Sequence, residues 1–270
     1  MRAVKTLKPL PLEPFTKQGL SFLRAPLLKE APSIEHAFMT RAGGVSPQPF
    51  NALNFGGDDT SANIKANMEL LGSVFSLPSC GVATVEQVHG SHVVVMEKAG
   101  ERSGTRPCGD AIITARAGLP IGILTADCVP VLLHDPVSGA IAAVHAGWRG
   151  FVAGVLGQTL SVMSRDFGAR PAHILAAIGP HIGPCCYEVS EDLITSFKKA
   201  GFATESCFTW TNGVIRLNLG LAVSEAITAL GLASAHLSRP GPCTSCNDSS
   251  FYSYRRERVT GRQLSFIMKR

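Results

Sequence analysis

The chain has few charged residues and no long hydrophobic run, and both shortages narrow the class of protein. Charged side chains make up 17% of the 270 residues, with 25 basic against 20 acidic groups and a net charge of +5. No segment approaches the ~18 consecutive apolar residues of a membrane span, and the N-terminus lacks the apolar core of a signal peptide. Basic residues form no stripe with interleaved aromatics, as nucleic-acid binding would favour. We therefore expect a cytoplasmic protein that binds neither membrane nor nucleic acid.

Eight cysteines are too few, in a chain of this length, for a small secreted scaffold held together by disulfides. In the cytoplasm they should be mostly reduced thiols. The neighbours Cys185 and Cys186 are unsuited to bonding each other, because the small ring strains disulfide geometry. Cys243-x-x-Cys246 resembles half of a zinc knuckle or a redox pair, but no second such motif completes it. We interpret Cys243 and Cys246 as structural.

Apolar periodicity predicts a mixture of helices and strands. Helical spacing covers residues 58–77, 152–167, 190–201 and 219–231. Short Val- and Ile-rich runs bounded by Gly, Asp and Pro predict strands at 81–88, 92–97, 111–114, 121–125, 129–135, 139–145, 173–179 and 214–218, and again within 251–270. Residues 1–30 are Pro-rich and favour an irregular N-terminal arm or an edge strand. No linker divides the chain, so we predict one α+β domain over 1–270, with mixed β-sheets flanked by helices.

Three short stretches place metal-binding residue types at the ends of predicted strands. His89 follows the strand that ends in "EQVHG", Cys128 lies between two apolar strands in "TADCVP", and His145 ends the strand in "AVHAGWRG". Imidazole nitrogen and thiolate sulfur are ligands that zinc prefers, and three protein ligands leave one tetrahedral position for water or substrate. The residues come from different strands, whose ends are expected to converge on a cleft.

The same three residues allow other interpretations. A histidine at a strand end can be an ordinary hydrogen-bonded residue, and a buried cysteine often packs as a small hydrophobe. Alternatively, Cys128 is a thiolate nucleophile with His145 or His89 as its base. The spacing by itself does not separate these interpretations.

An ordered set of motifs resembles the YfiH-like family, whose members are often labelled laccase-domain or multicopper polyphenol oxidoreductase proteins. The motifs are "TRAGGVSPQPFNALNFGGDD", "EQVHG", "GDAIIT", "TADCVPVLL", "AVHAGWRG", "AIGPHIGPCCYEV" and "FYSYRR" with "GR" after it, spanning about residues 38 to 268. The resemblance implies a zinc site formed by His89, Cys128 and His145, where copper could also bind. It further implies a purine nucleoside enzyme that phosphorolyses adenosine, inosine, guanosine and methylthioadenosine and deaminates adenosine.

Such chemistry needs further groups beside the metal. Deamination needs a proton carrier, and Asp127 and Glu86 lie near the ligands in sequence, although both could be structural. Phosphorolysis needs a phosphate site, which suits the planar fork of arginine. Candidates are Arg41 in "TRAGG", Arg149 at a predicted helix start and, less favoured, Arg255 with Arg256. Tyr187 could stack on a purine, although core packing is the commoner role. The expected partners are purine nucleosides and phosphate, with the protein a monomer or homodimer.

Rival functions remain open at this stage. A multicopper oxidase needs four coppers and paired His-x-His motifs, yet none of the eight histidines forms such a pair. Laccase-like phenol oxidation would then require copper in the zinc site, since copper binds such ligands more tightly. A cysteine- or metal-dependent amide hydrolase acting on peptidoglycan precursors would use Cys128 and His145. A non-enzymatic metal-binding protein is the third alternative.

Overall fold

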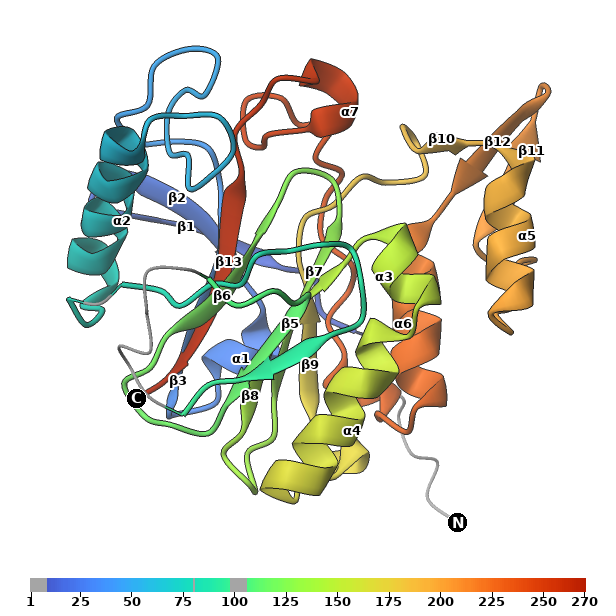
Figure 1. Cartoon of the computed structure of the whole chain (residues 1–270), viewed down its shortest axis with the longest axis horizontal. Coiled ribbons are helices and arrows are strands. Elements are labelled where there is room, and N and C mark those ends of the chain that lie inside the picture. Colours follow the sequence, from blue (N-terminus) through green and yellow to red (C-terminus); the bar gives the residue numbers. More distant parts are fainter. Residues whose placement is uncertain (1–8, 80, 98–105) are drawn as a thin grey trace.

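A computed structural model of the chain describes residues 9–79, 81–97 and 106–270, and it contains two five-stranded sheets packed face to face (Figure 1). In spatial order, the first sheet consists of β1 (Glu13–Lys17), β2 (Leu20–Arg24), β3 (Ile34–Met39), β13 (Gln263–Lys269) and β6 (Ile121–Thr125). The second consists of β4 (Val93–Val95), β5 (Ala111–Thr114), β8 (Ile141–Ala146), β7 (Val129–His134) and β9 (Leu175–Ile178).

Apolar side chains from both sheets form the core between them. Ile123 and Ile267 come from the first sheet, and Ile112, Leu132 and Ala143 come from the second. The strands are antiparallel neighbours throughout, except that β4 runs parallel to β5. Since both faces of each sheet are covered, the central strands are continuous apolar runs rather than alternating ones.

Helices cover the outer faces of this sandwich. The helix α2 (Ser61–Phe75) packs on the first sheet through Leu71, Val74 and Phe75, while α4 (Val155–Phe167) and α6 (Leu219–Ala229) pack on the second. Beside them lies a small sheet of β10 (Glu188–Val189), β12 (Val214–Leu217) and β11 (Phe208–Thr211), with α5 (Glu191–Lys199) against it. Short helices are α1 (Pro26–Lys29), α3 (Trp148–Val152) and α7 (Tyr254–Glu257), with single 3-10 turns at Pro171–His173 and Ser234–His236. The predicted α+β class, with mixed sheets flanked by helices, is confirmed.

Several local predictions need correction. Residues 81–88 form isolated bridges, at Ala83 and Glu86, instead of a strand. Of the two alternatives predicted for residues 1–30, the edge strand holds for 13–24, which form the β1–β2 hairpin with β1 at the sheet edge, and the irregular arm does not; residues 1–8 lie outside the described part. The helix predicted over 152–167 is interrupted at Gly154, whose φ of +85° separates α3 from α4. Residues 254–257 form α7 instead of a strand because Ser253 caps a helical turn, accepting a hydrogen bond from the Arg256 N–H.

Among the described residues, no helix combines the length and apolar character that crossing a membrane requires.

One buried histidine ties the N-terminal hairpin to the helix that follows it. His36, in the middle of β3, accepts a hydrogen bond through Nε2 from the Ala25 N–H at 2.9 Å. Burial, with the nearby charge of Arg24 as a smaller cause, lowers the pKa of His36 to about 3. His36 is therefore neutral in the folded state, although an unfolded histidine would take up a proton near pH 6.5.

We predict that His36→Gln makes stability less sensitive to acid. Because the folded-state pKa is depressed, protonation of unfolded His36 costs the wild type about 1.4 kcal/mol of unfolding free energy per pH unit below about 6.5. The glutamine amide oxygen can still accept from Ala25 but does not titrate. Urea unfolding at pH 7.5 and pH 5 should show a smaller loss for the variant, by about 2 kcal/mol. Equal losses in both proteins would contradict the prediction.

Candidate active site

Strand register in the second sheet brings the predicted metal-binding residues together. The strands β7 and β8 are antiparallel, with Val129 opposite Ala146, so Cys128 at the start of one strand lies beside His145 at the end of the other. Along β8, Ile141 and Ala143 face the other sheet, and the two-residue period turns His145 to the same side. The thiol Sγ of Cys128 lies 3.8 Å from His89 Nε2, and the His89 and His145 rings are 4.8 Å apart at their centres.

Asp110 orients the His145 ring and holds the backbone at His89, although it was not among the residues predicted from the sequence. Its buried carboxylate accepts from His145 Nδ1–H at 2.8 Å, and from the backbone N–H groups of His89 at 2.9 Å and Gly90 at 2.6 Å. These bonds leave Nε2 of His145 directed toward Cys128. In the sequence, Asp110 directly precedes the predicted strand "AIIT", within the motif "GDAIIT" that resembles the YfiH-like family. Its role as a hydrogen-bond partner of His145 follows only from the pairing of β5 with β8.

The electrostatics of the three donors suit a metal. Burial would raise the pKa of Cys128, but the charge and hydrogen bond of His145, followed by those of His89, lower it to about 6. Burial opposes the charging of His145, yet Cys128 and Asp110 raise its pKa to about 9. A negative sulfur thus faces protonated imidazole near neutral pH, and a bound cation can replace that proton.

Glycines after His145 leave room for this cluster. A Cβ on Gly147 would lie 2.9 Å from Cys128 Sγ and 3.0 Å from His89 Cδ2, closer than carbon atoms tolerate. A Cβ on Gly150 would lie 2.7 Å from the carbonyl oxygen of Gly90. The glycines of "HAGWRG" therefore allow α3 to pass directly beside the donors.

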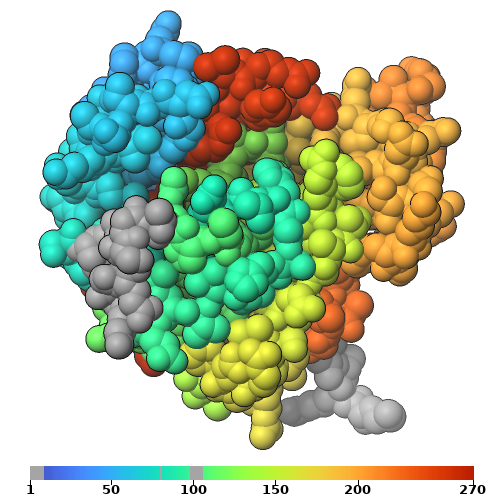
Figure 2. Space-filling view, in the orientation of Figure 1, coloured from blue at the N-terminus to red at the C-terminus, as the bar shows by residue number. Residues whose placement is uncertain are grey.

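The donors open into a pocket at one end of the sandwich, with a volume of about 700 Å³. Figure 2 shows a hollow on this face between the red segment that contains α7 and the green segments below it. Among the described residues, the charged lining is mainly basic, with the acids Glu86 and Asp127 against Arg106, Arg149, Arg255, Arg258 and Arg262. Such a surface attracts anions.

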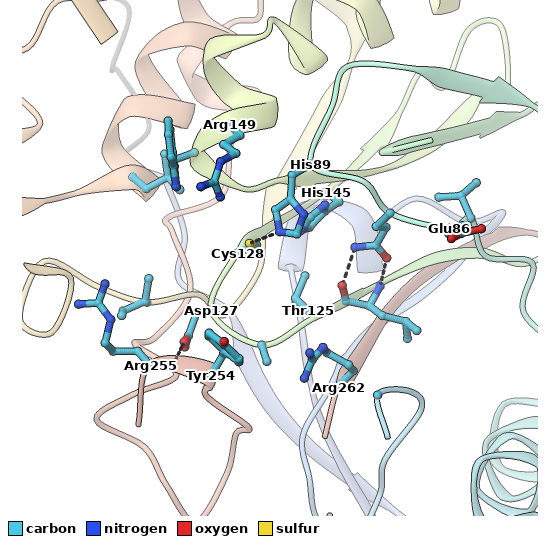
Figure 3. Close-up of a pocket in the computed structure, with 18 of the residues that line it drawn as sticks. Glu86, His89, Thr125, Asp127, Cys128, His145, Arg149, Tyr254, Arg255 and Arg262 are labelled. Carbon is cyan, nitrogen blue, oxygen red and sulfur yellow. Dashed lines mark hydrogen bonds between the residues drawn. The ribbon is translucent and has the colours of Figure 1, made fainter. Parts of the chain in front are cut away.

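Asp127 lies in this pocket, but both of its carboxylate oxygens are engaged. Oδ1 accepts from the Thr244 hydroxyl at 2.6 Å. Oδ2 accepts from the Arg255 backbone N–H at 2.6 Å, the bond drawn as a dashed line at Asp127 in Figure 3. The residue has a φ of +98°, which is rare for a side-chain-bearing residue. These contacts fit a positioning role, joining the Cys128 loop to α7, better than the predicted role of proton carrier.

Arg41 lies apart from the predicted site. It lines a different depression, its guanidinium is paired with Glu257 at 2.8 Å and bonded to the Asn51 carbonyl, and it covers the Tyr252 ring. The structure therefore places Arg41, predicted as a phosphate ligand, outside the pocket of His89, Cys128 and His145, with its charge compensated by Glu257.

The other predicted residues do line the pocket. Arg149 lies over the Trp148 ring at the start of α3, and its guanidinium has no hydrogen-bond acceptor among the described residues. Arg255 instead donates to the carbonyl oxygens of Cys186 and Glu188 and covers one face of Tyr187. Figure 3 shows Arg149 on one side of the three donors, with Arg255 and Arg262 on the other.

The histidines exclude a four-copper cluster. All eight lie in the described part of the chain, and there only His89 and His145 belong to a group that could hold a metal. His36, His134 and His181 are buried and bonded to the backbone at the Ala25 N–H and the carbonyl oxygens of Ala140 and Gly179. The site fits one metal ion with two nitrogen donors and one sulfur donor.

We predict that Asp110→Asn weakens metal binding by about 10- to 100-fold, as loss of a group that orients a ligand typically does. The amide cannot accept from all the N–H groups now bound and leaves His145 less firmly oriented. Zinc affinity of the metal-free protein, measured against a chromophoric chelator, tests this. Asp58→Asn, at an exposed position, is the matched control; equal affinity in all three proteins would contradict the prediction.

Comparison with known proteins identifies the family. Residues 35–270 match the family model described as "Multi-copper polyphenol oxidoreductase laccase". Purine nucleoside phosphorylase ORF3 of Streptomyces griseus is 38% identical over 237 residues, which is 87% of this chain and 94% of the relative. Purine nucleoside phosphorylase YfiH of Escherichia coli is 32% identical, covering 92% and 99%. The crystal structure of YlmD from Geobacillus stearothermophilus superposes with a TM-score of 0.87 at 31% identity, covering 97% and 100%. The chain belongs to the YfiH family of laccase-domain proteins, as its motifs indicate.

Proposed function

We propose that this chain is a zinc-dependent purine nucleoside phosphorylase, with His89, Cys128 and His145 as the metal ligands. The observation that carries the proposal is the opening of these three donors into an arginine-lined pocket of about 700 Å³. That volume suits a nucleoside with phosphate, since small-molecule sites commonly span about 300–1,000 Å³. The relatives named purine nucleoside phosphorylase, at 32–38% identity over most of the chain, support the same reaction class.

The phosphate site is assigned to Arg149. The guanidinium groups of Arg106, Arg149 and Arg258 have no hydrogen-bond acceptor among the described residues, whereas Arg255 and Arg262 already donate to backbone carbonyls. Of these three, Arg149 is chosen because it begins the helix α3 directly after His145 and lies beside the donors (Figure 3). A free planar fork beside the donors can bind two phosphate oxygens. Arg255 then acts as a positioning residue, because its guanidinium stacks on one face of the Tyr187 ring and holds the ring in place. The other face of the Tyr187 ring, on the pocket side, is left for the purine.

In phosphorolysis a phosphate oxygen attacks C1′ of the ribose while the C1′–N9 bond breaks. The electron pair of that bond passes to N9, the purine takes up a proton, and the products are the free base and ribose 1-phosphate. The arginines counter the negative charge of the attacking phosphate, and enclosure in the pocket holds the two substrates in line. Adenosine, inosine, guanosine and methylthioadenosine are the proposed substrates.

We propose that the same pocket also deaminates adenosine: the oxygen of a water molecule bonds to C6 of the purine, and the C6 amino group leaves as ammonia. A zinc ion held by the three donors would supply a Lewis acid and lower the pKa of a bound water to about 7. Asp110 keeps His145 in the tautomer that presents Nε2. Since Asp127 is fully engaged, Glu86, exposed at the pocket wall, is the proposed proton carrier.

A second candidate is hydrolysis of an amide, with Cys128 as nucleophile. The observation in its favour is the pKa of about 6 that His145 and His89 impose on the thiol, which makes it a thiolate at neutral pH. Activity that survives metal chelation and is lost on thiol alkylation would favour this candidate. Phosphorolysis that requires the metal favours the first.

We predict that adenosine and phosphate incubated with the zinc-loaded protein yield adenine and ribose 1-phosphate, with inosine from deamination. His145→Ala should lower both rates by about 100-fold or more, because a metal ligand and its charge stabilisation are lost. Product separation by chromatography measures this. His173→Ala, in a surface turn, is the matched control and should retain activity. Absence of product in the wild type would rule out the nucleoside function.

We predict further that Arg149→Gln raises the KM for phosphate by about 10- to 100-fold, the loss expected for charge-assisted hydrogen bonds. Deamination, which uses no phosphate, should be much less affected. Arg165→Gln removes the same charge from an exposed position of α4 and serves as control. An unchanged KM for phosphate would reassign the phosphate to another arginine of the pocket.

A further inference from the structure

Four cysteine side chains outside the candidate active site lie together on two loops. Cys185 and Cys186 precede β10, whereas Cys243 and Cys246 lie in the segment before α7. The four sulfur atoms lie within 4.8 Å of one another. Cys246 Sγ is 3.2 Å from Cys185 Sγ and 3.3 Å from Cys186 Sγ. The pair that completes the half-knuckle at 243–246 is therefore the vicinal pair at 185–186, about 60 residues earlier.

We infer that a second metal site, which holds a structural zinc ion, is formed by Cys185, Cys186, Cys243 and Cys246. The existence of this site does not depend on the proposed activity. In a tetrahedral site with Zn–S bonds of about 2.3 Å, neighbouring sulfurs are about 3.8 Å apart. The separations in this cluster run from 3.2 Å to at most 4.8 Å, so they bracket this value. Four protein sulfurs leave no position for water, which is the composition of a structural site.

The backbone around the cluster is arranged as for a thiolate ligand. The Gly183 N–H donates to Cys243 Sγ at 3.1 Å. A Cβ on Gly183 would lie 3.1 Å from Cys243 Cβ and 3.3 Å from Cys185 Sγ, so a larger residue would press on the sulfurs. Cys185 and Cys246 are exposed, which gives a cation a path from solvent.

A disulfide explains the cluster less well. Cys246 Sγ is almost equally close to two sulfurs, and one bond would satisfy only one of them. The remaining two thiols would stay crowded beside it. A cation at the centre satisfies all four at once, since thiolates repel one another and bind zinc as anions.

The proposed zinc would fasten one wall of the active-site pocket. Between the two loops, the Thr244 N–H bonds the His181 carbonyl at 2.9 Å, and the Thr244 hydroxyl bonds Asp127. The Cys186 carbonyl accepts from Arg255, which covers Tyr187. The cluster thus lies behind residues that shape the pocket, without reaching into it.

Metal content of the full chain tests the site. In a Cys128→Ser background, where the active-site ligand set is broken, zinc-supplemented protein should retain one zinc ion per chain by native mass spectrometry and elemental analysis. Adding Cys246→Ser should remove that ion or weaken its retention against a chelator. Adding Cys108→Ser, a cysteine outside both groups, should leave it in place.

Cobalt provides a readout that does not depend on variant folding. Wild-type protein loaded with Co²⁺ should show the thiolate-to-metal charge-transfer absorption of a tetrathiolate site, stronger than one thiolate at Cys128 can give. Loss of nucleoside cleavage in Cys128→Ser with one zinc retained would separate the two sites. Absence of zinc from the Cys128→Ser protein, or a mass two hydrogens lower from a Cys185–Cys246 disulfide, would overturn the second site without bearing on the proposed activity.

Discussion

The buried carboxylate of Asp110 is the group on which the geometry of the candidate active site depends. It accepts hydrogen bonds from the His145 ring and from the backbone N–H groups of His89 and Gly90, so one side chain orients the His145 ring and holds the backbone that carries His89. The pairing of β5 with β8 brings it opposite His145, where the His145 N–H also bonds the Asp110 carbonyl at 2.7 Å. The hydrogen bonds from these donors offset the unfavourable desolvation of the buried Asp110 carboxylate. Breaking them would leave the carboxylate buried and unpaired, and this free-energy penalty keeps the site in one arrangement.

The two sulfur-containing clusters differ in the number of donors, and that difference separates their proposed roles. His89, Cys128 and His145 leave a coordination position facing a pocket, which suits a metal that acts on substrate. The four cysteines would fill all four coordination positions of a tetrahedral metal ion and come from two loops distant in sequence. This arrangement suits a metal that stabilises the fold. The hydrogen bond between Thr244 and Asp127 connects the two clusters. A metal that held the two cysteine loops in place would therefore also hold Asp127 in the wall of the pocket.

The fold brings together arginines that are spread along the sequence. The net charge of +5 is modest, yet arginines from distant parts of the chain meet at one pocket in which Glu86 and Asp127 are the acidic lining residues among those the structure describes. Most of them are held by backbone carbonyls or aromatic rings, which fixes their direction, and Arg149 keeps its hydrogen-bonding edge free. An anion can therefore be attracted to the pocket without a strongly basic protein.

The sequence by itself determined the class of fold and the three candidate metal ligands. Periodicity marks the helices over 61–75 and 219–229, and donor type at the ends of predicted strands singles out His89, Cys128 and His145, although the segment before His89 forms isolated bridges. Only the tertiary structure revealed the part played by Asp110, removed Arg41 from the site and joined the two cysteine pairs. The reason is physical: local patterns record backbone period and side-chain chemistry, whereas distances between residues far apart in the chain follow from strand order and register, which no short motif contains.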